Sequence, residues 1–166
     1  MSKKSLLLFF ASMISFQAQC GLKELVSYVS AQTDVPEWVI SKVCTHESQS
    51  FYKNQRQPWP WTTNESGRGR WFSSMDAAVA YAEKQIKSGT KNIDVGICQM
   101  NWRYHGHKFD SVEDMFNPVR NMLEAAKFIK TFKKDSNSWV DAIGKYHSPG
   151  NEERAAAYIQ KVLAKS

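Results

Sequence analysis

Internal repeats, low-complexity tracts and Gly/Ser-rich linkers are absent from this sequence of 166 residues. A chain of this length without a linker is expected to form one domain, large enough to bury a hydrophobic core. Aromatic residues make up 13% and charged residues 23% of the sequence, which is the composition of an ordinary globular protein. Extensive disorder is therefore excluded as the native state of the chain.

The sequence also lacks a hydrophobic run that would span a bilayer comfortably. The apolar run SLLLFFASMISF follows a basic MSKK segment and ends before QAQCG, as in a secretory signal peptide. Ala18 and Cys20 are small and suit a cleavage site, so we expect residues 1–20 to be a signal peptide and residues 21–166 to be the exported, periplasmic domain. The alternatives are an uncleaved anchor or a lipid anchor on Cys20, which has two glutamines as poor neighbours for lipidation. We expect the mature protein to have no membrane anchor.

Cysteine is scarce, with three residues in the chain. If Cys20 leaves with the signal peptide, Cys44 and Cys98 remain, and they form either one disulfide or two buried thiols. A zinc site that adds His46 is disfavoured, because the spacing matches no standard ligand pattern and HESQS lacks the second histidine of HExxH. The HGH segment, with no third ligand, is an equally weak metal site. The sequence thus predicts no metal and no cofactor.

The positive charge of the chain is modest. Lysine and arginine number 22 against 16 acidic residues, a net charge of +6, and removal of Lys3 and Lys4 with the signal peptide leaves +4 (20 against 16). Such a charge favours anionic polymers through a generic, salt-dependent attraction. Nucleic acid is disfavoured, because the basic residues are scattered and no recognition motif is present. Cell-wall glycan with acidic stem peptides suits an exported protein better.

Helical periodicity dominates the rest of the sequence, and strand signals are weak. Apolar spacing, N-cap residues and terminal glycine or proline predict helices over residues 22–32, 36–48, 73–89, 117–132, 138–146 and 151–165. A short hairpin arm at residues 68–72 is the best strand candidate. The prediction is a predominantly helical α+β domain with one long aromatic-rich loop.

One carboxylate lies on a face that the pattern predicts to be buried. Ile40, Val43 and Cys44 form an apolar stripe, and Glu47 continues it at the i+7 position. Burial disfavours the ionised form of a carboxylate, and a protonated carboxyl can protonate a leaving oxygen. Glu47 is therefore the candidate general acid. The alternative is an exposed glutamate on the last turn of the helix.

Two further segments carry side chains suited to carbohydrate. Trp59 and Trp61, in the aromatic-rich loop, form either a rim that stacks against sugar rings or a satellite core beneath the loop. Gln99 and Asn101, in the turn DVGICQMN, have amides that donate and accept hydrogen bonds, as recognition of sugar hydroxyl and acetamide groups requires. Most amides of this kind are solvated surface residues, so alone they identify no site.

In combination, a helix ending in ES, the segment GICQMN and the segment AIGKYHS resemble the three motifs of the lytic transglycosylase family, glycan-cleaving enzymes with a goose-lysozyme-like fold. The resemblance covers essentially all of residues 20–166. The segments PWPWTTNESGRGRWF, IDVGICQMN and YHSPG are similar to the branch that accompanies conjugation, secretion and pilus machines. The resemblance implies a lysozyme-like fold, peptidoglycan glycan strands as substrate and components of such a machine as partners.

The resemblance also implies roles for individual residues. Glu47 would protonate the bond between MurNAc and GlcNAc and then accept the proton of the muramic C6 hydroxyl, which closes a 1,6-anhydro ring without a second carboxylate. Ser48 would orient Glu47 or form a hydrogen bond with it, Gln99 and Asn101 would line the cleft, and Tyr146 would place its hydroxyl near the reacting centre; its alternative is a core aromatic residue.

The roles just given require the helix end that carries Glu47 to meet the turn that carries Gln99. Cys44 and Cys98 are therefore expected to lie close together, where a disulfide would hold the acid at its cleft. The chain departs from many relatives at Tyr146-His147, where they have Tyr-Asn, so a substrate contact made by that asparagine is in doubt here.

Two other functions stay open. A lysozyme-type hydrolase of the same fold would need a second carboxylate, for which Glu65, Asp94 and Asp110 are candidates that no motif distinguishes. A non-catalytic glycan-binding or assembly protein would not need the acid of the Glu-Ser pair.

Overall fold

The computed structural model describes residues 21–52, 55–56, 58–136 and 138–164, so the predicted signal peptide lies outside the described residues. The described part is predominantly helical, with a small antiparallel sheet, which confirms the α+β class. The helices are α1 (Leu22–Thr33), α2 (Glu37–Ser48), α3 (Met75–Lys87), α4 (Trp102–His105), α5 (Val112–Phe116), α6 (Pro118–Lys134), α7 (Trp139–His147) and α8 (Glu152–Leu163), with a 3-10 turn η1 (Gly106–Lys108).

The six predicted helices are confirmed as α1, α2, α3, α6, α7 and α8, and polar caps explain where four of them begin. The side chains of Ser74, Asn117, Ser138 and Asn151 each accept a hydrogen bond from a backbone N–H in the first turn of α3, α6, α7 and α8. The short helices α4 and α5 were not predicted. Each spans five residues or fewer, too short for a periodic pattern to be recognised.

The strands are short, and their pairing could not be read from the sequence. β4 (Arg68–Trp71), β3 (Thr62–Glu65), β5 (Ile93–Val95) and β6 (Met100–Asn101) form one antiparallel sheet in that order, and β1 (Phe51–Tyr52) pairs with β2 (Gln55–Arg56). The predicted hairpin arm is confirmed as β4, which pairs with β3. The second half of the predicted aromatic-rich loop (residues 51–72) is therefore a hairpin rather than irregular structure.

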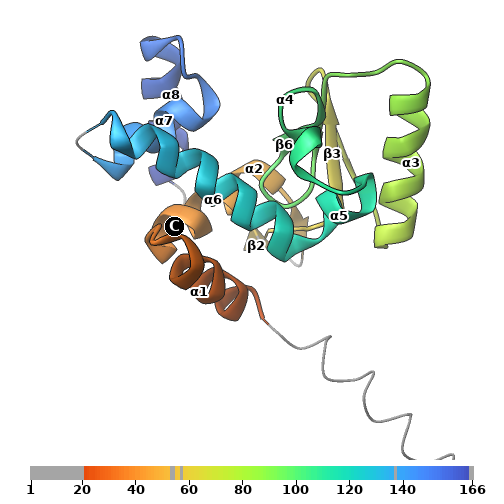
Figure 1. The fold of residues 1–166 in the computed structure, drawn as a ribbon, viewed down its shortest axis with the longest axis horizontal. Coiled ribbons are helices and arrows are strands. Elements are labelled where there is room, and N and C mark those ends of the chain that lie inside the picture. Colours follow the sequence, from red (N-terminus) through yellow and green to blue (C-terminus); the bar gives the residue numbers. More distant parts are fainter. Residues whose placement is uncertain (1–20, 53–54, 57, 137, 165–166) are drawn as a thin grey trace, which may run out of the picture.

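The longest helix, α6, connects the two parts of the molecule. Figure 1 shows α1, α7 and α8 at one end of α6, and the sheet with α3, α4 and α5 at the other. The core lies along this helix and includes Val29, Ile40, Val43, Ile93, Met115, Phe116, Met122, Ile129 and Ile143, each at most 1% exposed. None of the helices within the described ranges is long and apolar enough to cross a membrane.

Candidate active site

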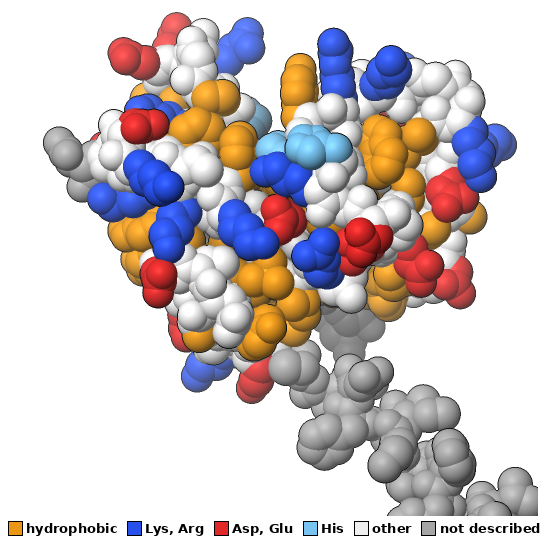
Figure 2. All heavy atoms as spheres, in the orientation of Figure 1, with side chains coloured by type: hydrophobic (Ala, Val, Ile, Leu, Met, Phe, Trp, Pro, Cys, Tyr) orange, Lys and Arg blue, Asp and Glu red, His pale blue; other side chains and the backbone are white. Residues whose placement is uncertain are grey.

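A cleft of about 820 Å³ lies where α2, α4, α7 and α8 approach the turn that follows β5. Figure 2 shows this side of the molecule hollowed between its helical part and its sheet part, with histidine side chains at the edge. Four residues that the sequence singled out line the cleft: Glu47, Gln99, Asn101 and Tyr146. Three other candidates are not part of its lining: Ser48, Trp59 and Trp61.

Glu47 lies on the last turn of α2, and its carboxylate is held by a residue of the last helix. The hydroxyl of Tyr158, on α8, donates a hydrogen bond to Oε1 of Glu47. Tyr158 is only 4% exposed. Burial, together with the negative charge and the hydrogen bond of Glu47, raises the pKa of Tyr158 well above its usual value. Tyr158 therefore keeps its proton at neutral pH and remains a donor to Glu47.

Two histidines hold the ring of Tyr158 in place. His46 lies edge-on to it, with ring centroids 5.1 Å apart, and His147 stacks parallel to it at 4.4 Å. Burial, and then the positive charges of Lys161 and Arg154, lower the pKa of His147. A neutral His147 can stack on Tyr158 without bringing a charge to the ring. The sequence assigned no role to His46 or His147, and the structure places both against the residue that binds Glu47.

Tyr146 connects α7 to the turn on the opposite side of the cleft. Its hydroxyl donates to the backbone oxygen of Cys98 at 2.6 Å and lies 3.5 Å from Sδ of Met100. Burial, and then the charges of Glu47 and Asp94, raise the pKa of Tyr146 well above its usual value. Both carboxylates are thus close enough to act on this phenol. Tyr146 lines the cleft, but its proton is committed to the backbone of the turn.

Gln99 projects from a tight turn that begins at Gly96. Its Nε2 donates to the backbone oxygens of Gly96 at 2.8 Å and Thr62 at 3.3 Å. Because both neighbours are acceptors, the NH₂ group must face them, and Oε1 has no hydrogen-bond partner among the described residues. Gly96 has φ 84°, and a Cβ there would lie 2.5 Å from Nδ2 of Asn121. The turn therefore requires glycine at position 96. The same turn directs the NH₂ group of Gln99 to the backbone and leaves its Oε1 without a partner among the described residues.

Asn121 holds the same turn in place through hydrogen bonds to its backbone. The sequence analysis did not identify Asn121 as a functional residue. It is fully buried on α6. Its Oδ1 accepts from the backbone N–H of Cys98 at 2.9 Å, and its Nδ2 donates to the backbone oxygens of Val95 at 3.0 Å and Met115 at 2.8 Å. A signal was present, because Asn121 lies on the apolar face of its helix, four residues before Ala125. Glu47 was identified because it is a polar residue on a face predicted to be buried, and the same reasoning applies to Asn121.

A disulfide bond joins Cys44 to Cys98, whose Cα atoms are 4.2 Å apart. Of the two alternatives that the sequence left open, the structure contains the disulfide. Cys44 lies one turn before Glu47, and Cys98 directly precedes Gln99. The bond therefore fixes the end of α2 against the turn, so that the acid and the amide share one cleft.

Asn101 and Asp94 form a polar pair on the wall of the cleft. Nδ2 of Asn101 donates to Oδ1 of Asp94 at 2.7 Å and to Oδ1 of Asn92 at 2.9 Å, and its own Oδ1 caps α4 by accepting from the backbone N–H of Arg103. The amide of Asn101 is thus fully occupied within the protein. Burial raises the pKa of Asp94, and the hydrogen bond from Asn101 opposes this shift.

Of the three carboxylates considered as a second catalytic group, Asp94 is the one that lines the cleft. Glu65 lies at the end of β3 and is close to Tyr81, whose pKa it helps to raise. Asp110 is exposed in the loop before α5. A mechanism with two carboxylates would therefore pair Glu47 with Asp94.

Ser48 does not form the hydrogen bond to Glu47 that the resemblance allowed for. Its side chain is 1% exposed, and its hydroxyl has no hydrogen-bond partner within the described part of the chain. Its backbone oxygen instead accepts from Nε1 of Trp71 at 2.8 Å. This bond ties the end of α2 to β4, so Ser48 supports the position of Glu47 through its backbone.

Trp59 and Trp61 pack against the protein rather than around the cleft. Nε1 of Trp59 donates to the backbone oxygen of Phe72 at 2.8 Å, and the two indoles meet edge to face at 5.4 Å. Both are half-buried, and Trp61 packs against the main core. This geometry favours the satellite core over the glycan rim. The exposed aromatic side chain at the cleft is Tyr104, on α4, at 62% exposure.

His105 follows Tyr104 and also lines the cleft. Its ring lies against Phe128, with centroids 4.7 Å apart. Burial, and then the positive charges of Lys108 and His107, lower the pKa of His105 to about 4. Its imidazole is therefore neutral at physiological pH. The sequence considered this histidine as a metal ligand in HGH and otherwise missed it.

No group of three or more His, Cys, Asp or Glu side chains that could hold a metal ion occurs among the described residues. Comparisons of the chain with protein-family models, with curated proteins and with solved structures found no match.

Proposed function

We propose that the protein is an exported peptidoglycan lytic transglycosylase with a lysozyme-like fold, which cleaves the β-1,4 bond between MurNAc and GlcNAc. The observation that carries the proposal is the position of Glu47. It lies in a cleft that it shares with Gln99 and Tyr146, so that all three motif segments contribute to one site. A signal-like leader and a disulfide bond support export to the periplasm.

In the proposed reaction, Glu47 protonates the glycosidic oxygen as the bond from that oxygen to C1 of MurNAc breaks. The C6 hydroxyl of the same sugar then bonds to C1, and its proton passes to the carboxylate of Glu47. The two proton transfers restore the carboxyl group, and no water is consumed. Tyr158 orients the carboxylate for both transfers by holding Oε1 in place.

The other side chains of the cleft suit the binding of a sugar strand. The unpaired Oε1 of Gln99 can accept from a sugar hydroxyl or acetamide N–H. The exposed ring of Tyr104 offers a flat surface for a pyranose. Glycan cleaved here would open the wall locally for a conjugation, secretion or pilus machine.

A lysozyme-type hydrolase is the second candidate, and Asp94 is the observation that favours it. This carboxylate lines the same cleft, and its raised pKa marks a perturbed environment of the kind found at functional sites. Asp94 would then stabilise the glycosyl cation or activate a water molecule. For the first candidate Asp94 is not a catalytic group, and its hydrogen bond with Asn101 gives it a structural role instead.

Digestion of purified sacculi in H₂¹⁸O tests the proposal directly. A transglycosylase forms the 1,6-anhydro end from the sugar's own oxygen, so the products should carry no label and should be lighter than reducing muropeptides by one water. A hydrolase would place ¹⁸O at C1 of every new reducing end. Labelled reducing ends would replace the proposed reaction by hydrolysis. Binding to sacculi without any release of muropeptides would instead indicate a glycan-binding protein.

A further inference from the structure

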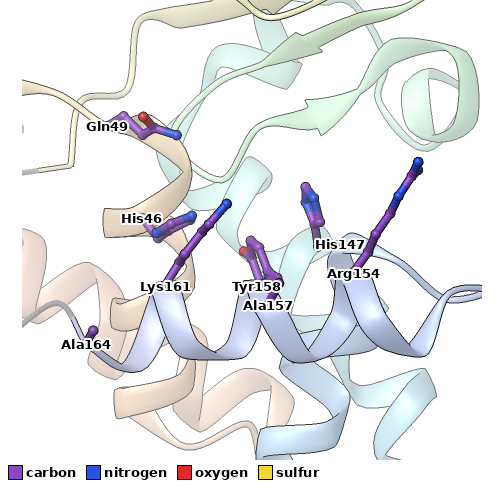
Figure 3. A pocket seen from close by; sticks show the side chains of 8 residues that line it. All are labelled: His46, Gln49, His147, Arg154, Ala157, Tyr158, Lys161 and Ala164. Carbon is purple, nitrogen blue, oxygen red and sulfur yellow. The ribbon is translucent and has the colours of Figure 1, made fainter.

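A second pocket of about 640 Å³ is contiguous with the candidate active site. It shares Tyr158, His147, His46 and Gln49 with the cleft and extends along α8. Figure 3 shows Lys161, Tyr158 and Arg154 projecting from one side of α8, with His147 beside them and His46 and Gln49 at the end of α2. We call this space the α8 pocket.

The α8 pocket is built from one face of its helix, and that face is basic. Its helical lining lies at positions 154, 157, 158, 161 and 164, which recur at the spacing of a single stripe. Arg154 and Lys161 lie at the two ends of this stripe, and the small alanines near them leave the space open. Glu152 and Glu153 are on the same helix but are not part of the lining.

The two cations of the pocket are not neutralised by the protein. Both side chains are exposed, and neither forms an ion pair or a side-chain hydrogen bond with another described residue. No Asp or Glu belongs to the pocket lining. Their charges reach its inner wall, because both lower the pKa of His147. An anion that entered the pocket would meet two unpaired cations and no competing carboxylate.

We propose that the α8 pocket binds a free carboxylate of the stem peptide carried by the muramic acid residue that Glu47 acts on, an inference that rests on the proposed function. The stem peptide is attached to the same sugar ring as the reacting C1, so its acidic groups leave the cleft close to Glu47. The α8 pocket adjoins the cleft at Tyr158, the residue that binds Glu47. The planar guanidinium of Arg154 can bind a carboxylate through two parallel hydrogen bonds.

The α8 pocket is expected to distinguish stem peptides with free carboxyl groups from stem peptides without them. A stem peptide whose carboxyl groups are amidated would still present its backbone, but it would offer no anion to Arg154 and Lys161. A glycan strand without stem peptides would offer neither. The structure therefore assigns the protein a preference for glycan that carries stem peptides with free carboxyl groups.

The test measures binding rather than cleavage, so that the two proposals can fail separately. Glu47→Gln serves as the common background, which keeps the glycan intact during the measurement. Its affinity is compared for native sacculi, for sacculi with amidated carboxyl groups and for sacculi stripped of stem peptides. The same set is measured after the further change Arg154→Gln/Lys161→Gln.

A matched control removes the same charge elsewhere. Lys23 and Lys134 are exposed, line neither the cleft nor the α8 pocket, and form no ion pair with another described residue. Lys23→Gln/Lys134→Gln therefore lowers the net charge equally. Because the substituted side chains of both pairs are exposed, all the variants are expected to fold, and circular dichroism checks this.

We expect amidation to weaken binding of the background protein about three- to tenfold, as for partly solvated ion pairs. The pocket variant should bind native sacculi as weakly as the background protein binds amidated ones, and amidation should have no further effect on it. The control pair should keep the preference. Equal binding of native and amidated sacculi by the background protein would overturn the inference. An equal loss of affinity for native sacculi in the pocket variant and in the control pair would also overturn it. This outcome does not depend on whether the wild-type protein cleaves glycan.

Discussion

The phenolic hydroxyl of Tyr158 donates a hydrogen bond to Oε1 of Glu47, although 111 residues separate the two in the chain. The bond links the end of α2 to the middle of α8, and it fixes one oxygen of the carboxylate that faces the cleft. The donor is buried and its pKa is raised, so it keeps its proton and the contact persists at neutral pH.

Tyr158→Phe removes this hydrogen bond and keeps the ring that stacks on His147. We expect kcat to fall about 10- to 100-fold, because a hydrogen bond to a charged group contributes about 1.5–3 kcal/mol. The alkaline limb of the pH–rate profile, where rate is lost as the general acid ionises, should also move to higher pH, since a carboxylate that loses a donor holds its proton more tightly. Tyr28→Phe, at a tyrosine 50% exposed on α1, is the control. An unchanged pH profile would show that Tyr158 does not act through Glu47.

The disulfide between Cys44 and Cys98 closes a loop of 54 residues. On the chain-entropy account, loss of a crosslink of this size lowers the free energy of unfolding by about 4 kcal/mol. Cys44→Ala/Cys98→Ala should therefore lower the urea concentration at the unfolding midpoint strongly. The activity of this variant should fall further than the loss of stability explains, because the bond also holds Glu47 near Gln99. A denaturation curve identical to that of the oxidised wild type would mean that the bond contributes nothing to stability.

His105 should make the fold sensitive to acid. Its pKa is about 4 in the folded protein against an ordinary value of 6.5, so the unfolded chain binds more protons between these values. The stability contributed by the neutral imidazole is fully present above pH 6.5 and is lost as the pH falls toward 4. His105→Asn should reduce the acid destabilisation by on the order of 1–3 kcal/mol. Parallel curves of unfolding free energy against pH for the two proteins would contradict this account.

The aromatic residues can be separated by paired measurements of stability and binding. Trp59→Ala/Trp61→Ala should lower the unfolding free energy by about 2 kcal/mol or more, because both indoles pack in the satellite core. Tyr104→Ala should leave the melting temperature nearly unchanged and weaken sacculus binding about threefold or more, as expected for one stacked ring. If the tryptophan variant instead kept its stability and lost sacculus binding, the two tryptophans would form a glycan rim.

The helices and the position of Glu47 on the last turn of α2 could be predicted because their signals are local. Caps and apolar spacing within a few residues determine where α3, α6 and α7 begin, and the stripe through Val43 and Cys44 placed Glu47 on a buried edge. The disulfide could be stated as one of two alternatives, because two cysteines allow one pairing.

The residues that complete the site depend on contacts between distant segments. Tyr158 has the pattern of a core aromatic on α8, and nothing near it in the sequence indicates that its hydroxyl meets α2. The hairpin arm at β4 was predicted, but β3, β5 and β6 have four residues or fewer, and their alternation is too short to recognise. Asn121 could have been found, because it is a polar residue on the apolar face of α6.

The central claim is that Glu47 transfers the proton in both steps, and Glu47→Gln tests it most directly. The amide keeps the shape of the side chain and can still pair with Tyr158, but it cannot donate and recover a proton. Release of 1,6-anhydromuropeptides from purified sacculi, measured by mass spectrometry for both proteins at matched folded concentration, is the measurement. We expect wild type to release them, and the variant to be slower by about 10⁴-fold, the upper end of general acid–base catalysis. A folded Glu47→Gln protein that released the same products at the wild-type rate would contradict the account.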